Sequence, residues 1–140
     1  MESIADIPFV VHTGIMCDGA RVTLTPRAEL ANHLGTLHAG AIYTLAESES
    51  GRYLRDRYAD MRADIVPLLR TSQMRYKKPI DTPATATASL LPAEAMRFEK
   101  MFAKKGRGSV SVIVEVLDAS GDLCATGEFV WYVQKRTVNL

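Results

Sequence analysis

Apolar residues recur every three or four positions in one long stretch of the chain, from about residue 38 to residue 58. The stripe consists of Ile42, Leu45, Ala46, Glu49 and Tyr53. Because an α-helix repeats every 3.6 residues, this spacing predicts one long helix. Basic residues near its end, at Arg52, Arg55 and Arg57, suit the negative end of a helix dipole.

Alternating apolar and polar positions predict strands before and after this helix. The β-prone runs are 9–16, 20–24, 64–78, 84–91, 109–117 and 123–134. The first two flank Cys17, Asp18 and Gly19, and an Asp-Gly pair favours a tight hairpin turn. The last two flank Ser120, Gly121 and Asp122, which predicts a second hairpin.

A second, shorter helix is predicted over 92–106. Pro92 suits a first helical position, and Gly106 suits a helix end. The resulting order of elements predicts an α+β fold, in which a curved, mainly antiparallel sheet of five to six strands wraps around the long helix. Such a sheet leaves an edge and an apolar face open, which a two-fold partner could cover. We expect one domain over residues 1–140.

Composition narrows the function classes. The chain has 140 residues, a net charge of +1, 47% hydrophobic and 24% charged residues, which is ordinary for a globular protein. A charge this small gives no support for nucleic acid as a partner. The acidic start of the chain differs from a secretory signal, and no apolar run is long enough for a membrane span, so we expect a cytoplasmic protein without a membrane partner.

Cysteine and histidine are too few and too scattered to suggest a metal site. Cys17 and Cys124 are best interpreted as reduced thiols. His12, His33 and His38 lack the spacing of metal ligands, and we predict no metal.

The start of the long helix, at His38, Ala39 and Gly40, is the strongest candidate for chemistry. Backbone N–H groups at a helix N-terminus lack intrahelical acceptors and can hold a carbonyl oxygen or an anion. Two carboxylates follow on the helix, Glu47 and Glu49, and either could act as base or nucleophile. The apolar stripe mildly favours Glu49, so spacing alone leaves the choice open.

This stretch resembles a segment of the hot-dog fold acyl-CoA thioesterases. The matching residues are Asn32, Gly35, Thr36, His38, Ala39, Gly40, Ile42, Leu45, Ala46 and Glu47. The similarity is to the phenylacetic-acid-pathway type, to one type of 4-hydroxybenzoyl-CoA thioesterase, and equally to an uncharacterised thioesterase-like branch. Family members usually have His-Gly-Gly where this chain has His38, Ala39 and Gly40, a departure that affects the fit of the substrate more than the chemistry.

The resemblance implies roles for individual residues. Glu47 would be the catalytic carboxylate, the Ala39 N–H would polarise the thioester carbonyl, and Asn32 would hydrogen-bond the attacking water or the carboxylate. His38 would orient the loop or form a hydrogen bond near the thioester, with Gly40 beside the substrate. A strand residue such as Thr71, Ser72 or Gln73 would contribute across a dimer. Gly51 stands where some relatives carry a hydroxyl group.

Basic side chains could bind the phosphates of coenzyme A at the mouth of the site, since Arg and Lys are charge-assisted donors. The candidates are Arg70, Arg75, Lys77 and Lys78 on one segment, and Lys104, Lys105 and Arg107 on another. Arg75, Lys77 and Lys78 are the ones we assign to substrate binding.

We therefore expect a thioesterase that hydrolyses an acyl-CoA or a related acyl thioester to a free acid and a thiol, acting as a homodimer or a dimer of dimers. Coenzyme A would enter as part of the substrate, with no separate cofactor. The alternative is a hot-dog dimer that binds acyl-CoA without hydrolysing it. Hydration or dehydration of acyl-CoA is less well supported, because the Asp/His or His/Glu pair of relatives with that activity is missing. The acyl group is set by pocket shape, which no linear motif reports.

Overall fold

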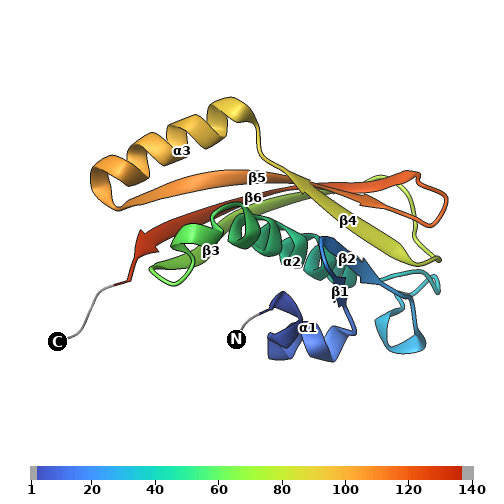
Figure 1. Ribbon diagram of the computed structural model, residues 1–140. Helices are drawn as coiled ribbons and strands as arrows, with labels where there is room; N and C mark the ends of the chain where they lie inside the picture. The colour runs from blue at the N-terminus through green and yellow to red at the C-terminus, as the bar shows by residue number, and fades with distance from the viewer. Residues whose placement is uncertain (1–2, 137–140) are drawn as a thin grey trace.

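A six-stranded antiparallel sheet, in the order β1-β2-β4-β5-β6-β3, organises the chain (Figure 1). The computed structural model describes residues 3–136. The strands are β1 Met16–Asp18, β2 Arg21–Leu24, β3 Ile65–Tyr76, β4 Ala84–Ser89, β5 Arg107–Leu117 and β6 Leu123–Lys135. The predicted α+β class and curved antiparallel sheet are confirmed.

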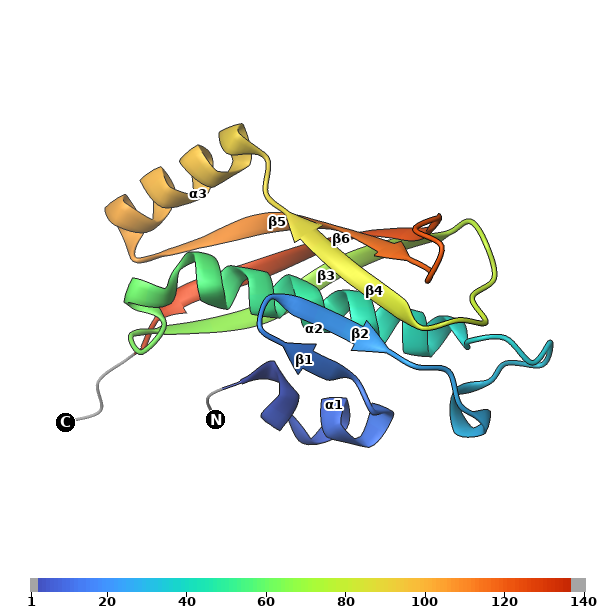
Figure 2. The same cartoon turned by 45° about the vertical axis from the view of Figure 1, so that its right-hand side comes forward.

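The longest helix, α2, lies along one face of this sheet, and the strands curl around it (Figures 1 and 2). The helices are η1 Ile4–Asp6, α1 Pro8–Thr13, η2 Ala28–Leu30, α2 Ala39–Arg57, η3 Ala59–Met61 and α3 Pro92–Lys105. The bounds of α2 agree within one residue with the predicted helix over 38–58. Those of α3 agree equally well with the helix over 92–106.

The core lies between α2 and the inner face of the sheet. Leu45 and Ala46 of α2 are fully buried, and α2 packs against β4, β5, β2 and β6. Alternate residues of β5 supply the opposing surface, namely Val110, Val112, Val114 and Val116, all fully buried. Period-2 burial along β5 is what the sequence pattern predicts for a strand with one face on a core.

The prediction of a strand over 9–16 is wrong except at Met16, where β1 begins. Residues Pro8–Thr13 form helix α1, which has Pro8 in its first turn and ends at Gly14 in the left-handed conformation. Val10 and Thr13, three positions apart, are its buried residues. The β-branched valines suggested a strand, but Pro at the start and Gly at the end are the stronger, helical signals. The hairpin that follows turns at Gly19 and Ala20, one residue later than predicted.

Helix α3 covers the part of the β5 edge that pairs with no strand among residues 3–136. Strand β4 pairs with β5 over 113–117, and the earlier part of β5 lies beside α3 instead. The Glu94 carboxylate accepts a hydrogen bond from the Ser111 N–H at 3.0 Å, and Arg97 donates to the Ser109 carbonyl at 2.8 Å. Two side chains of the helix thus replace the backbone partners that a neighbouring strand would supply.

Strand β3 ends the sheet on the other side. It pairs with β6 over its whole length, with an irregularity between Leu69 and Thr71, and its other edge faces no strand in the part of the chain described. Pro67 lies in this strand. Proline is tolerated on an edge strand because one row of ladder hydrogen bonds is not required there. A twelve-residue open edge is a place where a second chain can add.

We predict that Glu94→Ala lowers the free energy of unfolding by about 1–3 kcal/mol, the usual cost of leaving a buried donor unsatisfied. The Ser111 N–H loses its acceptor in this variant, and Arg97 loses its ion pair. Urea denaturation measures the change, with Lys100→Ala on the exposed side of α3 as the control. Equal stabilities of the two variants would show that Glu94 does not close the β5 edge.

Candidate active site

The loop before α2 is held together by the side chain of Asn32. Its Oδ1 accepts hydrogen bonds from the backbone N–H groups of Leu34 at 2.9 Å and Thr36 at 3.0 Å. Its Nδ2 donates to the Thr36 hydroxyl at 2.9 Å. The structure therefore places Asn32 as the organiser of the loop that leads into α2, with both ends of its amide engaged inside the loop.

The start of α2 leaves one backbone N–H without an acceptor. The His38 side chain caps the helix, since its Nδ1 accepts from the Gly40 N–H at 2.8 Å. The His38 carbonyl accepts from Ala41 at 2.9 Å and from Ile42 at 3.1 Å. Among residues 3–136 the N–H of Ala39 finds no such partner, and Ala39 is exposed. The one free amide of the first turn thus belongs to the residue predicted to polarise the thioester.

Gly40 and Ala39 each fit their position for a steric reason. A Cβ on Gly40 would lie 3.0 Å from His38 Nδ1, closer than ordinary packing allows, so glycine lets the imidazole cap the helix. Ala39 is the first residue of α2, and no described non-glycine residue has a positive φ, so its backbone needs no glycine. The Ala39 carbonyl also accepts a hydrogen bond from the Tyr76 hydroxyl at 3.2 Å, which ties α2 to strand β3.

Glu47 lies on the side of α2 that faces β3 and β6. Helical spacing puts it on one face with Tyr43 and Gly51, four positions before and after it. The Tyr43 hydroxyl shares a 2.8 Å hydrogen bond with the hydroxyl of Ser72 in β3, and Gly51 lies against Trp131 in β6. Glu47 is half-buried, and its carboxylate makes no hydrogen bond or ion pair within residues 3–136. Burial raises the pKa of the Glu47 carboxyl.

Glu49 points to the opposite side and is fully engaged. It is 2% exposed, and its Oε2 accepts from the Ala88 N–H of β4 at 2.9 Å. It also forms an ion pair with Arg52, which in turn donates to Asp56 at 2.7 Å. The apolar stripe in the sequence correctly indicated that Glu49 is buried. Its carboxylate, however, is already matched by a cation and a backbone donor.

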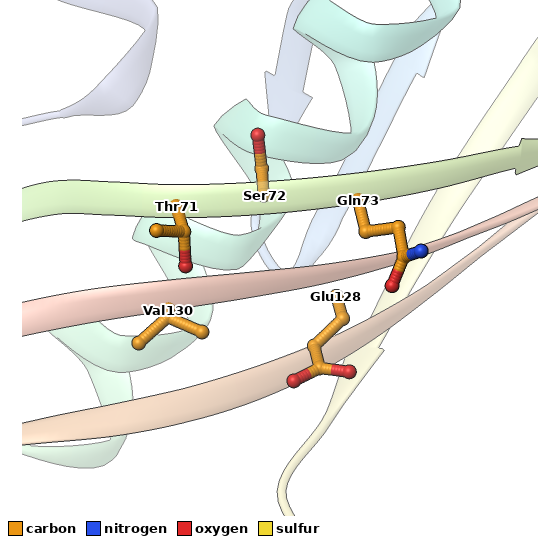
Figure 3. Close-up of a pocket in the computed structure, with 5 residues that line it drawn as sticks. All are labelled: Thr71, Ser72, Gln73, Glu128 and Val130. Carbon is orange, nitrogen blue, oxygen red and sulfur yellow. The ribbon is translucent and has the colours of Figure 1, made fainter.

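The two strand residues assigned to substrate binding face opposite ways. Figure 3 shows Thr71 and Gln73 of β3 pointing in one direction with Glu128 and Val130 of β6. These residues line a shallow hollow of about 340 Å³ on the sheet face away from α2. Ser72 points the other way, toward α2, where it meets Tyr43. Adjacent strand residues alternate between faces, so Thr71 and Ser72 do not act together within one chain.

The basic candidates do not form one patch. Arg75 and Lys77 are exposed near the end of β3, level with the start of α2. Lys78 lies 3.0 Å from Asp118 and 2.6 Å from Asp122, and these hydrogen bonds raise its pKa. Lys104 and Lys105 end α3, and their neighbour Arg107 pairs with Gln134, at the end of the sheet where β3 begins. A twelve-residue strand, roughly 40 Å long, separates the two basic groups.

Sequence reasoning named Ser72 and Gly51 but missed the contacts by which they and their neighbours join α2 to the sheet. Tyr43, Ser72 and Tyr76 tie the first half of α2 to β3, and the Trp131 indole N–H donates to the Ser50 hydroxyl at 3.0 Å. Gly51 packs against Trp131, whose ring a Cβ at this position would contact at 3.4 Å. The sequence pointed to these contacts only through the candidate Ser72 and through the hydroxyl group that members of the resembling family carry at the position of Gly51.

A family model described as a domain of unknown function, DUF4442, matches residues 9–133. The chain belongs to this family. A comparison of the DUF4442 chain with curated proteins finds no match.

Solved structures resemble the DUF4442 chain closely in fold. A probable thioesterase of unknown function from Pseudomonas aeruginosa is 21% identical, covers 95% of this chain and 91% of its own, and has a TM-score of 0.80. A thioesterase from Haemophilus influenzae is 17% identical, with coverages of 94% and 86% and a TM-score of 0.72. A Bacillus halodurans protein solved with CoA is 23% identical, with coverages of 86% and 72% and a TM-score of 0.68. The neighbours confirm the predicted hot-dog fold.

Residues 3–136 contain neither a cluster of metal-ligand side chains nor a helix that could span a membrane. No group of three or more His, Cys, Asp or Glu side chains within residues 3–136 could hold a metal ion. None of the helices described is both long and apolar enough to cross a membrane. Cys17 and Cys124 are both free thiols.

We predict that Glu49→Ala costs about 3 kcal/mol of unfolding free energy, because it leaves Arg52 buried with only one of its two acidic partners. It also removes the acceptor of the Ala88 N–H. Glu49→Gln keeps an oxygen for that N–H and should cost less. Denaturation with urea distinguishes the variants, and a loss in Glu49→Ala below about 1 kcal/mol would contradict a structural role for the pair.

Glu47→Gln should have the opposite effect and stabilise the fold near neutral pH. The pKa of Glu47 is raised in the folded state, so its charged form is penalised there once the pH exceeds the unfolded-state value of about 4.3. The amide carries no charge. The melting temperature of Glu47→Gln should therefore exceed that of the parent at neutral pH, and the gain should vanish below about pH 4. A variant less stable than the parent at neutral pH would argue against a desolvated carboxylate.

Proposed function

We propose that the DUF4442 chain hydrolyses acyl-CoA thioesters as a homodimer with its active sites shared between two copies. The observation that supports this proposal is that α2 presents two groups without hydrogen-bond partners among residues 3–136, and both suit this reaction. One is the free Ala39 N–H at the helix N-terminus, and the other is the half-buried, unpaired Glu47 carboxylate. The structural neighbours named as thioesterases, and the neighbour solved with CoA, support the reaction class.

The two groups cannot act together within one chain. They are eight residues apart on one helix, a rise of about 12 Å. An oxyanion donor lies about 3 Å from the carbonyl oxygen, and an attacking atom lies about 3 Å from the carbonyl carbon, so a nucleophilic carboxylate must fall within roughly 7 Å of the amide, and a base acting through one water within roughly 10 Å. Helical side chains tilt toward the N-terminus of the helix, but this tilt is too small to bring the Glu47 carboxylate within these distances of the Ala39 N–H. Glu47 therefore needs the Ala39 amide of a second copy.

The open edge of β3 offers the way to bring two copies together. Helix α2 runs opposite to β3, because its first residue is tied to Tyr76 at the end of the strand. Further along α2, Gly51 lies near Trp131. Trp131 pairs with Leu69 in the first half of β3. If the β3 edges of two copies pair antiparallel about a two-fold axis, the two α2 helices run in opposite directions along the joined sheet. The start of one α2 is thereby brought toward the middle of the other.

The chemistry follows from these two groups. The thioester oxygen accepts the Ala39 N–H, which stabilises the negative charge that develops there. Glu47 takes a proton from water, the water oxygen bonds to the carbonyl carbon, and the carbon–sulfur bond breaks. The proton returns from Glu47 to the thiolate, releasing CoA and the free acid. Direct attack by Glu47, followed by hydrolysis of the anhydride, uses the same geometry.

Neighbouring residues would assist without touching the reacting bond. His38 and Asn32 hold the loop and the first turn that present the Ala39 amide. Arg75 and Lys77 are exposed cations at the same end of the molecule as Ala39, where they suit the phosphates of CoA. Lys78 is the weaker candidate, because Asp118 and Asp122 already match its charge.

A second candidate function is acyl-CoA binding without turnover. One observation favours it: Gly51, one turn after Glu47, supplies no hydroxyl to hold a water molecule. The nearby Ser48 and Ser50 hydroxyls donate instead to the carbonyls of Thr44 and Glu47. Tight binding of acyl-CoA without release of thiol would establish this function.

Glu47→Gln should lower kcat/KM by about 10²–10⁴, the usual contribution of a catalytic acid–base group. A panel of acyl-CoA substrates assayed with a thiol reagent measures the loss, with the exposed Glu115→Gln as the matched control. Because only the ionised form accepts a proton and burial raises the pKa of Glu47, the rate should fall on the acid side at a pH above the ordinary glutamate pKa. An unchanged rate in Glu47→Gln would remove Glu47 from the mechanism.

Ala39→Pro tests the backbone donor, which no ordinary side-chain change removes. Proline lacks the N–H and is well tolerated at the first position of a helix, the position that Ala39 holds. We expect kcat to fall by about 10²–10³ with little change in melting temperature. Ala39→Ser keeps the N–H and should retain activity within a few-fold. Full activity in Ala39→Pro would place the oxyanion donor elsewhere.

A further inference from the structure

A cleft of about 820 Å³ opens beside the second half of α2. One wall is α2 after Glu47, and the other is formed by the start of β3 and the end of β6, which lie side by side in Figure 2. The N-terminal segment closes one side. Its apolar lining includes Ile4, Leu54, Ile65, Pro67, Trp131 and Val133. A volume of this size is within the range of small-molecule sites.

The cleft begins at Gly51, one helical turn beyond Glu47. Because glycine has no side chain, no atom of residue 51 projects between the α2 backbone and the Trp131 ring at that point. A Cβ on Gly51 would lie 3.4 Å from the Trp131 ring and 3.7 Å from Ile4 Cδ1. The ring cannot easily move away, since Trp131 is nearly buried and its indole N–H is bonded to Ser50. Any larger residue at position 51 would therefore narrow the inner end of the cleft.

We propose that this cleft holds the hydrocarbon part of the acyl group, and that Gly51 keeps the inner end of the cleft wide enough for a long chain to enter. This inference rests on the proposed function, because it takes the thioester carbonyl to lie at Glu47. The nearest lining residue of α2 is Gly51, which lies one helical turn beyond Glu47 on the same face of the helix. From Gly51 to Tyr58 the helix rises about 10 Å, the length of roughly eight extended methylene groups.

The lining favours an acyl chain over the pantetheine arm of CoA. The amide groups of pantetheine need hydrogen-bond partners, and buried amides without them are costly. The inner walls are aliphatic or aromatic, and the Tyr58 hydroxyl already donates to Glu99. The charged lining residues are Arg55, Arg62 and Arg136. Arg62 and Arg136 are exposed, and an arginine stem can extend an apolar wall while its head stays in water, so these two residues suit the outer end of the cleft.

Trp131 is the only tryptophan in the sequence and lines the cleft, so its fluorescence reports occupancy directly. The probes are CoA, S-ethyl-CoA and S-octyl-CoA, thioethers that cannot be hydrolysed. We expect S-octyl-CoA to change the Trp131 emission and to bind at least tenfold more tightly than S-ethyl-CoA. Gly51→Val should abolish this difference, and Ala103→Val, which adds the same bulk on the exposed face of α3, should leave it unchanged.

The outcomes separate this inference from the proposed function. Equal affinity for both thioethers, or an unchanged octyl preference in Gly51→Val, would overturn the inference even if Glu47-dependent hydrolysis were found. Length-dependent binding that Gly51→Val removes, together with no thiol release from any acyl-CoA, would support the cleft and refute hydrolysis. If circular dichroism shows that Gly51→Val does not fold, Leu54→Phe fills the same cleft and is held to the same outcomes.

Discussion

The burial of α2 against the curved sheet determines which chemistry the helix can present. One side of α2 supplies Leu45 and Ala46 to the core, and Glu49 on the neighbouring positions is drawn to β4, where Arg52 and a backbone N–H neutralise it. The opposite side faces β3 and β6. Glu47 is desolvated there without a matching cation, which raises its pKa. Two carboxylates only two residues apart thus have different environments, one structural and one available for reaction.

The pitch of the helix then sets the assembly that the reaction requires. The N–H at a helix N-terminus and a side chain two turns later are too far apart to act on the same thioester carbonyl group. A two-fold pair of helices solves this problem without any new element. The molecule offers an unpaired edge at β3, the strand that Tyr43 and Tyr76 tie to α2. The same strand would join the copies and align their helices.

The sequence predicted the elements whose periodicity is long and regular. The 3.6-residue pattern of α2 and the alternating valines of β5 agree with the structure almost to the residue. Helix α1 was missed because six residues are too few to show a period, and the valines there suggested a strand. The choice between Glu47 and Glu49 depends on Arg52 and the Ala88 N–H, and the Gly51 cleft depends on Trp131, eighty residues away in the chain. Such tertiary contacts leave no local signal.

The most direct test of a shared site is to mix two inactive variants, Glu47→Gln and Ala39→Pro, unfold them together and refold them. If each site takes Glu47 from one copy and the Ala39 amide from the other, each mixed dimer contains one intact site, and the mixture should regain about one quarter of the parent activity. Activity that stays at the level of the separate variants, while crosslinking shows mixed dimers, would contradict the account.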